Sequence, residues 1–321
     1  MNELLQLPGR GVIGVLTGGI SKERNPSLQS GESACESLLR QGYRVKVIDT
    51  AERTFLQELR EVDVAFLAIA GQFAEDGKLQ GTLEVLGIPY TGSGVLASAL
   101  AMHKPTAKTI VKAAGIEVYD EIRIDPDRDT KDIAKGIVDS LNLPVILKPE
   151  SEGSSIGADV AHSEAEIVDI IETSRSVGMQ MMAEPFDTGR CMTVGVLELE
   201  KGTVGLPPLE ILTPHEFFDH ASKQQGSLRS FHCPADISSD AQKNLSELAV
   251  AAHHALGCTG YSRSDFIIST DGRVHFLELN SLPSLKPTAT LATMSAYIGI
   301  SYDQMIQYIL KAGIQERGYR P

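Results

Sequence analysis

Two carboxylates and an amide, at Asp265, Glu278 and Asn280, lie in the segment from Arg263 to Asn280. An Asp-Gly dipeptide at positions 271–272 lies between two apolar-rich runs, which is typical of a two-residue hairpin turn. With that turn, Asp265 pairs with Glu278 and Arg263 pairs with Asn280. All four side chains then share one face, because side chains alternate along a strand. Oxygen donors of this kind suit Mg²⁺, which usually also contacts substrate phosphates.

A surface hairpin with a solvated polar face is the alternative interpretation of the same pattern. The two strands are unusually apolar for a solvated ribbon, and the residues responsible are Phe266, Ile267, Ile268, Phe276, Leu277 and Leu279. From the hairpin pattern alone, the metal site and the solvated hairpin both stay open.

A lysine followed by a small-residue loop is the second candidate for chemistry. The apolar run 143–147 predicts a strand that ends at Lys148, and the loop Glu-Gly-Ser-Ser-Ile-Gly follows at 152–157. Backbone N–H groups and hydroxyls in such a loop can bind phosphate oxygens. The loop is not a Walker motif, because no Gly-Lys-Ser/Thr ends it. A flexible turn is the alternative for the loop by itself, and the preceding lysine favours an anion site.

Alternating strands and helices in the first hundred residues must position the N-terminal part of any site. Strands are predicted at 12–16, 45–48 and 64–69, with a helix at 27–40, which indicates a parallel sheet in an α/β lobe. Loops at the strand ends carry Glu23 and Glu75, although acidic residues also occur simply as helix starts. A nicotinamide-dependent enzyme is not favoured, because the GxGxxG fingerprint is absent.

The rest of the chain mixes strands and helices less regularly. Residues 96–114 are predicted to be largely helical, and further strands are expected at 179–186, 193–197 and 207–212. Residues 213–234 are polar and lack periodicity, which predicts a closing loop over a site. A clean amphipathic helix is predicted at 244–256, with Gly257 as its C-cap.

Composition limits the classes of partner and compartment. The chain has 321 residues and a net charge of -13, which argues against non-specific binding to nucleic acid or to anionic membranes. The four cysteines show no paired metal-binding spacing and are expected to be reduced thiols. With no signal peptide and no membrane-length apolar run, a soluble cytoplasmic protein is expected.

Several motifs occur together in a recognisable order. They are Thr17-Gly-Gly-Ile-Ser-Lys-Glu-Arg24, Glu75-Asp-Gly-Lys-Leu-Gln-Gly81, Gly87-Ile-Pro-Tyr-Thr-Gly-Ser-Gly94, Lys148-Pro with the loop 152–157, and the hairpin continuing to Pro283. Over nearly the whole chain they resemble the D-alanine–D-alanine ligases, which belong to the ATP-grasp group.

The resemblance implies a three-lobed α/β (α+β) ATP-grasp fold. Its N-terminal open parallel-sheet lobe would occupy 1–100, the central lobe 101–188 and the C-terminal lobe 189–321, with the closing loop at 213–234 and the metal hairpin at 263–280. ATP would lie between the last two lobes and phosphorylate a carboxylate to an acyl phosphate, which an amine then attacks. The implied cofactors are ATP and Mg²⁺, with Mn²⁺ as a substitute, and the implied assembly is a homodimer acting on small amino-acid substrates.

The resemblance also assigns roles to individual residues. Lys104 and Lys148 match phosphate-binding lysines, Lys223 lies in the closing loop, and Arg263 matches the arginine that stabilises the transferring phosphate and the oxyanion. The magnesium ligands would be Asp265, Glu278 and Asn280.

Three further matches concern the amino-acid substrate and the adenine base of ATP. Glu23 matches the carboxylate that holds the ammonium group of the first substrate, and Ser154 matches a serine linked to it across the site. Glu184 stands where the family contacts adenine.

Departures from the family gather mainly at positions that shape the second-substrate pocket. Ala70 replaces a histidine, Gln224 replaces a tyrosine or phenylalanine of the closing loop, Ser284 replaces a glycine, and Ala289 replaces the serine that receives the acceptor carboxylate. Two other departures are Cys191, in place of a ribose-binding glutamate, and Lys286, in place of a small polar residue. The pattern is typical of altered specificity, because discrimination depends on which buried polar groups find partners.

D-alanyl-D-alanine synthesis is the leading function predicted by this match. The main alternative is a specialised ligase that joins other amino-acid-like substrates or closes an amide within one molecule. A nucleotide-binding regulatory relative without strong catalysis is a third hypothesis, which the retained lysines, Arg263 and metal-ligand matches argue against.

Overall fold

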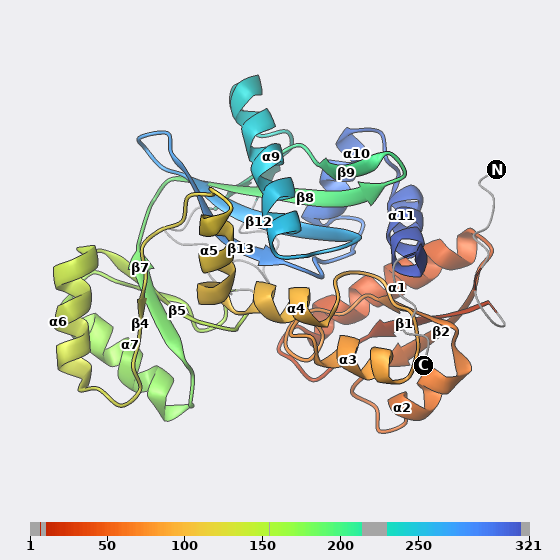
Figure 1. The fold of residues 1–321 in the computed structure, drawn as a ribbon, viewed down its shortest axis with the longest axis horizontal. Coiled ribbons are helices and arrows are strands. Elements are labelled where there is room, and N and C mark those ends of the chain that lie inside the picture. The colour runs from red at the N-terminus through yellow and green to blue at the C-terminus, as the bar shows by residue number, and fades with distance from the viewer. Residues whose placement is uncertain (1–6, 8–10, 154, 214–229, 316–321) are drawn as a thin grey trace.

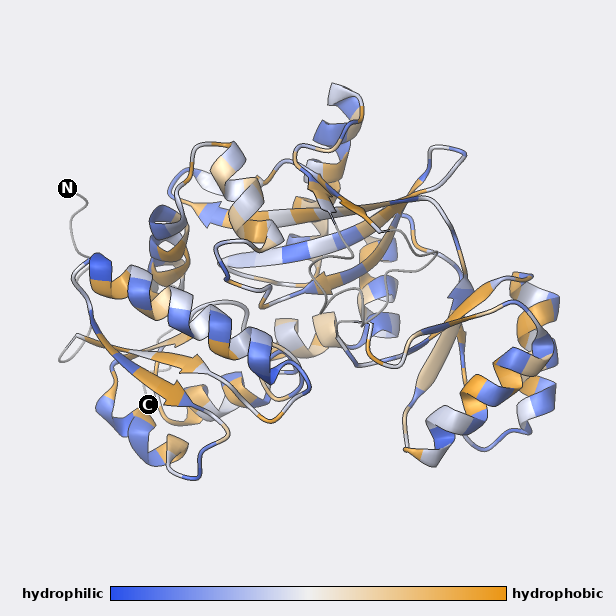
Figure 2. Cartoon of the chain, turned by 180° about the vertical axis from the view of Figure 1, so that it is seen from behind, coloured by the Kyte–Doolittle hydropathy of each residue, from blue (hydrophilic) through white to orange (hydrophobic). Residues whose placement is uncertain are grey.

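The computed structural model describes residue 7 and residues 11–153, 155–213 and 230–315, which form three β-sheets with their helices (Figure 1). The first sheet is parallel, as the sequence predicts, and its strand order is β2-β1-β3. Its strands are β1 (Val12–Thr17), β2 (Arg44–Asp49) and β3 (Val64–Leu67). Helices α1 (Arg24–Arg40), α2 (Phe55–Glu58) and α3 (Lys78–Val85) accompany it, with the short 3₁₀ turn η1 (Leu59–Glu61). Strands β1 and β3 are apolar along most of their length, whereas β2 and α1 mix polar and apolar residues (Figure 2).

The region predicted as one helix at 96–114 is two helices, α4 (Val95–Met102) and α5 (Lys104–Ala113). The break at His103 has a local cause, because Pro105 lacks an N–H and suits the first turn of a new helix. The His103 side chain caps α5 by accepting from the backbone N–H of Thr106. Both helices contact the last strand of the largest sheet.

The second sheet is antiparallel and forms a unit of its own with two helices. Its strand order is β4-β7-β5-β6, from β4 (Ile122–Arg123), β5 (Val145–Pro149), β6 (Asp159–Ala161) and β7 (Met181–Pro185). Helices α6 (Thr130–Leu141) and α7 (Glu164–Ser176) cover one face and start at the side-chain caps Asp129 and Ser163. The chain enters this four-stranded unit (residues 122–185) through residues 114–121 and leaves it through residues 186–189 (Figure 1).

The third sheet carries the predicted metal hairpin. Its order is β11-β10-β8-β12-β13, and β9 pairs with β8. The strands are β8 (Arg190–Leu199), β9 (Gly202–Gly205), β10 (Leu209–Leu212), β11 (Ser230–His232), β12 (Tyr261–Ile268) and β13 (Val274–Asn280). Helices α9 (Ser239–Ala255), α10 (Thr290–Tyr297) and α11 (Tyr302–Gln315) complete this region. In the described residues, we find no helix long and apolar enough to cross a lipid bilayer.

The hairpin has the predicted pairing but not the predicted turn. Arg263 pairs with Asn280 and Asp265 with Glu278. The two-residue turn is wrong: the backbone N–H groups of Ser269 and Gly272 donate to Arg273 and Ser269, which closes a three-residue loop with Gly272 at φ 84°. That loop alone would shift the register by one residue. A bulge at Leu277 restores it, because β13 carries one residue more than β12 beyond Asp265.

The three sheets fall within the predicted segments 1–100, 101–188 and 189–321. Helix α5, within the second segment, packs against β13 and α9 of the third. The lobe boundaries at these residues therefore stay a prediction. Of the predicted closing loop 213–234, residues 214–229 lie outside the described part of the chain.

Candidate active site

One cavity of about 550 Å³ lies where the three sheets meet. It is lined by loops after the N-terminal strands, by β5 and β7 of the four-stranded unit, and by the face of the β12–β13 hairpin. The predicted site residues within the described chain all line it; these are Glu23, Lys104, Lys148, Glu184, Arg263, Asp265, Glu278, Asn280, Ser284 and Ala289. Ser154, Lys223 and Gln224 lie outside the described residues.

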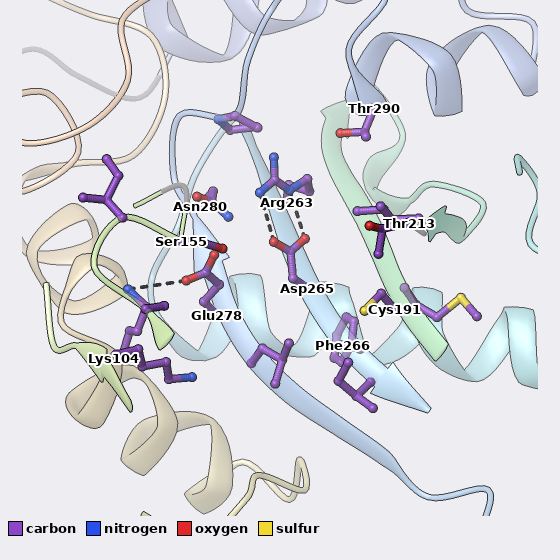
Figure 3. Close-up of a pocket in the computed structure, with 18 of the residues that line it drawn as sticks. Lys104, Ser155, Cys191, Thr213, Arg263, Asp265, Phe266, Glu278, Asn280 and Thr290 are labelled. Carbon is purple, nitrogen blue, oxygen red and sulfur yellow. Dashed lines mark hydrogen bonds and ion pairs between the residues drawn. The ribbon is translucent and has the colours of Figure 1, made fainter. Parts of the chain in front are cut away.

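Charge pairs hold the hairpin face. Arg263 binds Asp265 through two parallel contacts, from Nε to Oδ1 and from Nη2 to Oδ2, both 3.0 Å (Figure 3). Burial tends to lower the pKa of the Arg263 guanidinium, but the carboxylate of Asp265 raises it overall. The Thr193 hydroxyl on β8 also donates to Asp265. This network fixes the orientation of the hairpin's cation and its first carboxylate.

The remaining oxygen donors of the hairpin fit a divalent cation. Glu278 lies 3.4 Å from the ammonium group of Lys104 (Figure 3). The side-chain nitrogen of Asn280 is buried and has no hydrogen-bond partner among the described residues. Because amide nitrogen and oxygen are assigned from hydrogen bonds, turning the amide would place an acceptor oxygen at that position. If two carboxylates and one amide bound the cation, its remaining coordination positions would be open to water and phosphate oxygens. Mg²⁺ sites in proteins usually have such a mixture of ligands.

The phosphate end of the cavity collects lysines from two elements. Lys104 begins α5 and its ammonium group donates to the backbone carbonyl of Glu152, in the predicted phosphate loop. Lys148 is the next-to-last residue of β5 and lies 2.7 Å from Glu184. These contacts join the loop, the strand end and the hairpin around one space, so that bound phosphates would meet cations from several sides.

Lys108 is a charged residue that sequence reasoning missed. It is only 2% exposed, and it pairs with Glu184, with Glu121 at 2.7 Å and with the carbonyl of Tyr119 at 2.8 Å. Its spacing of four from Lys104 places both on one side of a helix, which is the sequence signal that was available.

Glu184 is therefore held between two ammonium groups. Burial alone would raise the pKa of its carboxyl, but Lys148 and Lys108 lower it overall. The contact of Glu184 with adenine stays a prediction.

Glu75 lies at the opposite end of the cavity, beside Glu23. Its side chain is buried, accepting from the backbone N–H of Gly71 at 2.6 Å and of Leu282 at 3.3 Å. Burial and the nearby charge of Glu23 raise the pKa of the Glu75 carboxyl to about 8. Glu75 thus links the first lobe to the loop that follows β13. The sequence marked its loop as a candidate but did not place Glu75 in the site.

The wall beside this acidic end is built from α1 and the loop after β13. The Ser30 hydroxyl lies 3.3 Å from that of Ser284 and accepts from the backbone N–H of Leu285. Lys286 donates to the side chain of Gln29 at 3.3 Å.

Alanines take two positions on the same wall. Ala70 and Ala289 line it with methyl groups, and Ala289 begins α10 without a side-chain cap. Where the family is expected to present a histidine and a serine, the cavity therefore has apolar surface.

A third part of the cavity is largely apolar. Its lining there includes Ile146, Phe186, Met192, Phe266, Ile267 and Leu277, together with Tyr119 and Asp187. Cys191 lies in the same part of the cavity (Figure 3). An apolar slot with a few polar groups at its rim suits a planar heterocycle.

Comparison with protein-family models agrees with this geometry. The model described as "D-ala D-ala ligase C-terminus" matches residues 110–311, and "D-ala D-ala ligase N-terminus" matches residues 49–93. The first alone spans more than half of the chain. The chain belongs to the D-alanine–D-alanine ligase family.

Sequence relatives cover almost the full length of this family member. It is 38% identical over 302 residues to the D-alanine–D-alanine ligase of Geotalea uraniireducens, with 94% of each chain covered. It is 35% identical over 310 residues to that of Carboxydothermus hydrogenoformans, with 95% of this chain and 99% of that protein covered.

Solved structures give the same relationship. The D-alanine–D-alanine ligase from Bacillus anthracis complexed with ATP matches with a TM-score of 0.81 at 27% identity, over 95% of this chain and 97% of that one. The VanG D-Ala:D-Ser ligase from Enterococcus faecalis has a TM-score of 0.81 at 27% identity, over 95% and 100%. The predicted α/β ATP-grasp fold is confirmed, and this family member is an ATP-dependent ligase.

Proposed function

We propose that this ligase joins two D-alanine molecules, using ATP to activate the carboxylate of the first. The observation that carries the proposal is one cavity in which Arg263 and Lys104 pair with the hairpin carboxylates and Lys148 pairs with Glu184. Phosphoryl transfer requires cations fixed around the charge that develops on the phosphate. The D-alanine specificity is supported by the names of the relatives at 35–38% identity.

Each charged group has a proposed task in the reaction. Lys104 and Lys148 bind phosphate oxygens, and Arg263 stabilises the charge of the transferring phosphoryl group and then of the tetrahedral oxyanion. Asp265, Glu278 and Asn280 would hold Mg²⁺, for which Mn²⁺ could substitute. When bound, the metal supplies positive charge next to the phosphates.

Substrate positioning falls to the acidic end. The carboxylate of Glu23 binds the ammonium group of the first amino acid, and Ser154 completes that contact across the site. Lys223 and Gln224 belong to the proposed closing loop, which excludes water from the acyl phosphate. Glu184 is proposed to lie beside the adenine of ATP, with its carboxylate held by lysines.

A ligase with another acceptor is the second candidate function. Ala70 and Ala289 present methyl groups to the acceptor side, while Ser284 and Lys286 add polar groups there. A structural relative that is itself a D-Ala:D-Ser ligase shows that the fold accommodates a different acceptor. Closure of an amide within one molecule belongs to the same alternative.

A substrate panel separates these functions. Phosphate release from ATP is measured with D- and L-amino acids, singly and in pairs, and products are identified by mass. Release with D-alanine together with the mass of D-alanyl-D-alanine is the expected result. Turnover only with another pair would overturn the D-alanine proposal in favour of the second candidate. No release with any substrate, despite ATP binding, would point to a regulatory role.

Assembly and compartment are further proposals. We expect a homodimer in the cytoplasm, in keeping with the family. Sedimentation analysis tests the first expectation, and cell fractionation tests the second.

A further inference from the structure

The two connections to the four-stranded unit are tied to each other at Asp187. Tyr119 lies in the incoming connection, 114–121, and its hydroxyl donates to Asp187 Oδ2 at 2.7 Å. Asp187 lies in the outgoing connection, 186–189, and its Oδ1 accepts from the backbone N–H of Gly189 at 2.7 Å. A single carboxylate therefore holds both places where the chain crosses between the unit and the rest of the molecule.

The same carboxylate is also anchored to the metal hairpin. The hydroxyl of Ser269, at the β12–β13 turn, donates to Asp187 Oδ2. The ring of Tyr119 stacks on that of His275 in β13, with centroids 4.1 Å apart and planes 17° from parallel. Just before Tyr119, the carbonyl of Glu117 accepts from the backbone N–H of Phe276 at 2.8 Å. The incoming connection thus lies along the hairpin's outer strand.

The charge state of the cluster agrees with these contacts. Burial opposes ionisation of Asp187, but hydrogen bonds from Ser269 and Tyr119 lower the pKa of its carboxyl overall. Burial raises the pKa of the Tyr119 phenol, so it stays a donor. Hydrogen bonds to a charged acceptor are stronger than neutral ones, so these contacts hold the connections together strongly. We call Tyr119, Asp187 and Ser269 the junction.

The junction borders the apolar end of the cavity. Tyr119 and the whole outgoing connection, residues 186–189, line it, next to Ile146, Ile267 and Leu277. Lys104 and Arg263 pair with the hairpin carboxylates at the proposed phosphate site. Lys148 pairs with Glu184, just before the outgoing connection, and so lies between that site and the apolar slot. A nucleotide whose phosphates meet those cations would place its planar base in the apolar slot.

We propose that Tyr119, Asp187 and Ser269 are positioning residues for the base of the nucleotide. They fix the connection 186–189 against the hairpin, so that one wall of the base slot is formed before the nucleotide binds. Preorganisation of this kind increases affinity by reducing the ordering required on binding. The inference rests on the proposed use of ATP, and it concerns the base, not the phosphates or the amino acids.

The discriminating experiment compares a ligand that has a base with one that lacks it. Calorimetry measures binding of AMP-PNP and of inorganic tripolyphosphate, both with Mg²⁺, to the wild type and to the Tyr119→Phe variant. We expect the Kd for AMP-PNP to rise about tenfold, which corresponds to roughly 1.4 kcal/mol, while the Kd for tripolyphosphate changes less than twofold. If the hydroxyl has only a structural role, the Kd values for the two ligands should rise by the same factor or both stay unchanged.

A matched variant controls for the loss of a buried tyrosine hydroxyl. Tyr302 donates to the carbonyl of Leu285 at 2.6 Å, on the acceptor side of the cavity. Tyr302→Phe should cost similar stability and leave the affinity for AMP-PNP unchanged. Ser269→Ala, at the hairpin turn, is the second probe of the junction and should weaken AMP-PNP in the same direction as Tyr119→Phe.

The outcomes keep this inference separate from the proposed ligation. A selective loss of AMP-PNP affinity in a protein that forms no dipeptide would support the base-positioning role and refute D-alanine ligation. Dipeptide formation with unchanged AMP-PNP affinity in both junction variants would refute the base-positioning role alone. If the wild type bound neither probe, nucleotide binding and this inference would both fail.

Discussion

Two buried carboxyl groups at opposite ends of the cavity are shifted in opposite directions. Glu184, on the proposed nucleotide side, lies between Lys148 and Lys108, and these cations lower the pKa of its carboxyl despite burial. Glu75, at the acceptor end, has backbone N–H groups and the charge of Glu23 for neighbours, and the pKa of its carboxyl is raised to about 8. Of two buried carboxyl groups, one is therefore held charged by neighbouring cations, and the other has a pKa shifted in favour of its neutral form.

The contrast agrees with the task proposed for each end. The proposed phosphate end would meet the same triphosphate in every turnover, and fixed ion pairs from three elements preorganise it. The proposed acceptor end would decide which amine enters, and there the wall presents two alanines, two serine hydroxyls and Lys286. The residues that match the family thus gather where charge is required, and those that depart gather mainly where shape and hydrogen bonding select a substrate.

The largest effect on turnover is expected from replacing Glu278 on the hairpin face. Glu278→Ala removes a proposed metal ligand and the partner of Lys104, and we expect turnover to fall by at least about 10³-fold. Phosphate release gives the rate, and circular dichroism with a thermal melt confirms that the fold is kept.

A control for Glu278→Ala lies on the same hairpin. Asp271 is exposed at the turn, where it pairs only locally with Arg273 among the described contacts. Asp271→Ala should leave turnover within about twofold, because exposed pairs contribute little. Equal activity of the two variants would remove the argument that the hairpin face binds metal and phosphate.

The hairpin also shows how far sequence reasoning reached. Alternation placed Arg263, Asp265, Glu278 and Asn280 on one face, and the pairing of these residues is confirmed. The turn was wrong by one residue, and the bulge at Leu277 cancelled that error. Loop length and bulge are coupled in three dimensions, because the apolar face must stay buried, and neither is visible from an Asp-Gly pair alone.

Other features needed tertiary contacts that no local pattern contains. The helix break at His103 was readable from Pro105, but it was missed because apolar periodicity continues across it. The burial of Lys108 depends on Glu184, 76 residues away, and the junction at Asp187 depends on Tyr119 and Ser269. Sequence spacing therefore identified the candidate site residues, while the residues that hold them in place came from the fold.

An intermediate effect is expected in the pH dependence of stability, where Glu75 and Glu184 should differ. The folded-state pKa of Glu75, about 8, lies above its ordinary value of 4.5. Its contribution is therefore fully present below about pH 4.5 and is lost as the pH rises toward 8. At about 1.4 kcal/mol for each pKa unit, the loss in unfolding free energy reaches a few kcal/mol.

Chemical denaturation at pH 5, 6, 7 and 8 tests this shift. Because the glutamine of Glu75→Gln does not ionise, the stability difference between that variant and the wild type should change in the variant's favour as the pH rises. Glu184→Gln is the matched control: its wild-type carboxyl has a lowered pKa, so the pH dependence of its effect should lie below about pH 4.5. Parallel curves for wild type and Glu75→Gln across pH 5–8 would contradict the raised pKa.

The smallest effects are expected at Ala289, where stability and acceptor binding can be separated. Ala289 is the N-cap of α10 and offers no side-chain acceptor to the helix. Ala289→Ser should stabilise the protein by about 1 kcal/mol through capping. Its hydroxyl can at the same time donate to an acceptor carboxylate, which should lower the KM for D-alanine as acceptor by about tenfold.

Ala289→Gly distinguishes the two consequences, because glycine is nearly as good an N-cap as serine but brings no hydroxyl. Denaturation should show a similar gain for both variants, whereas steady-state kinetics should show a lower acceptor KM for serine alone. An unchanged KM in Ala289→Ser, with the stability gain present, would mean that the acceptor carboxylate binds elsewhere on the wall. Lys286 would then be the cation to remove next, since it lines the same wall and donates to Gln29 across it.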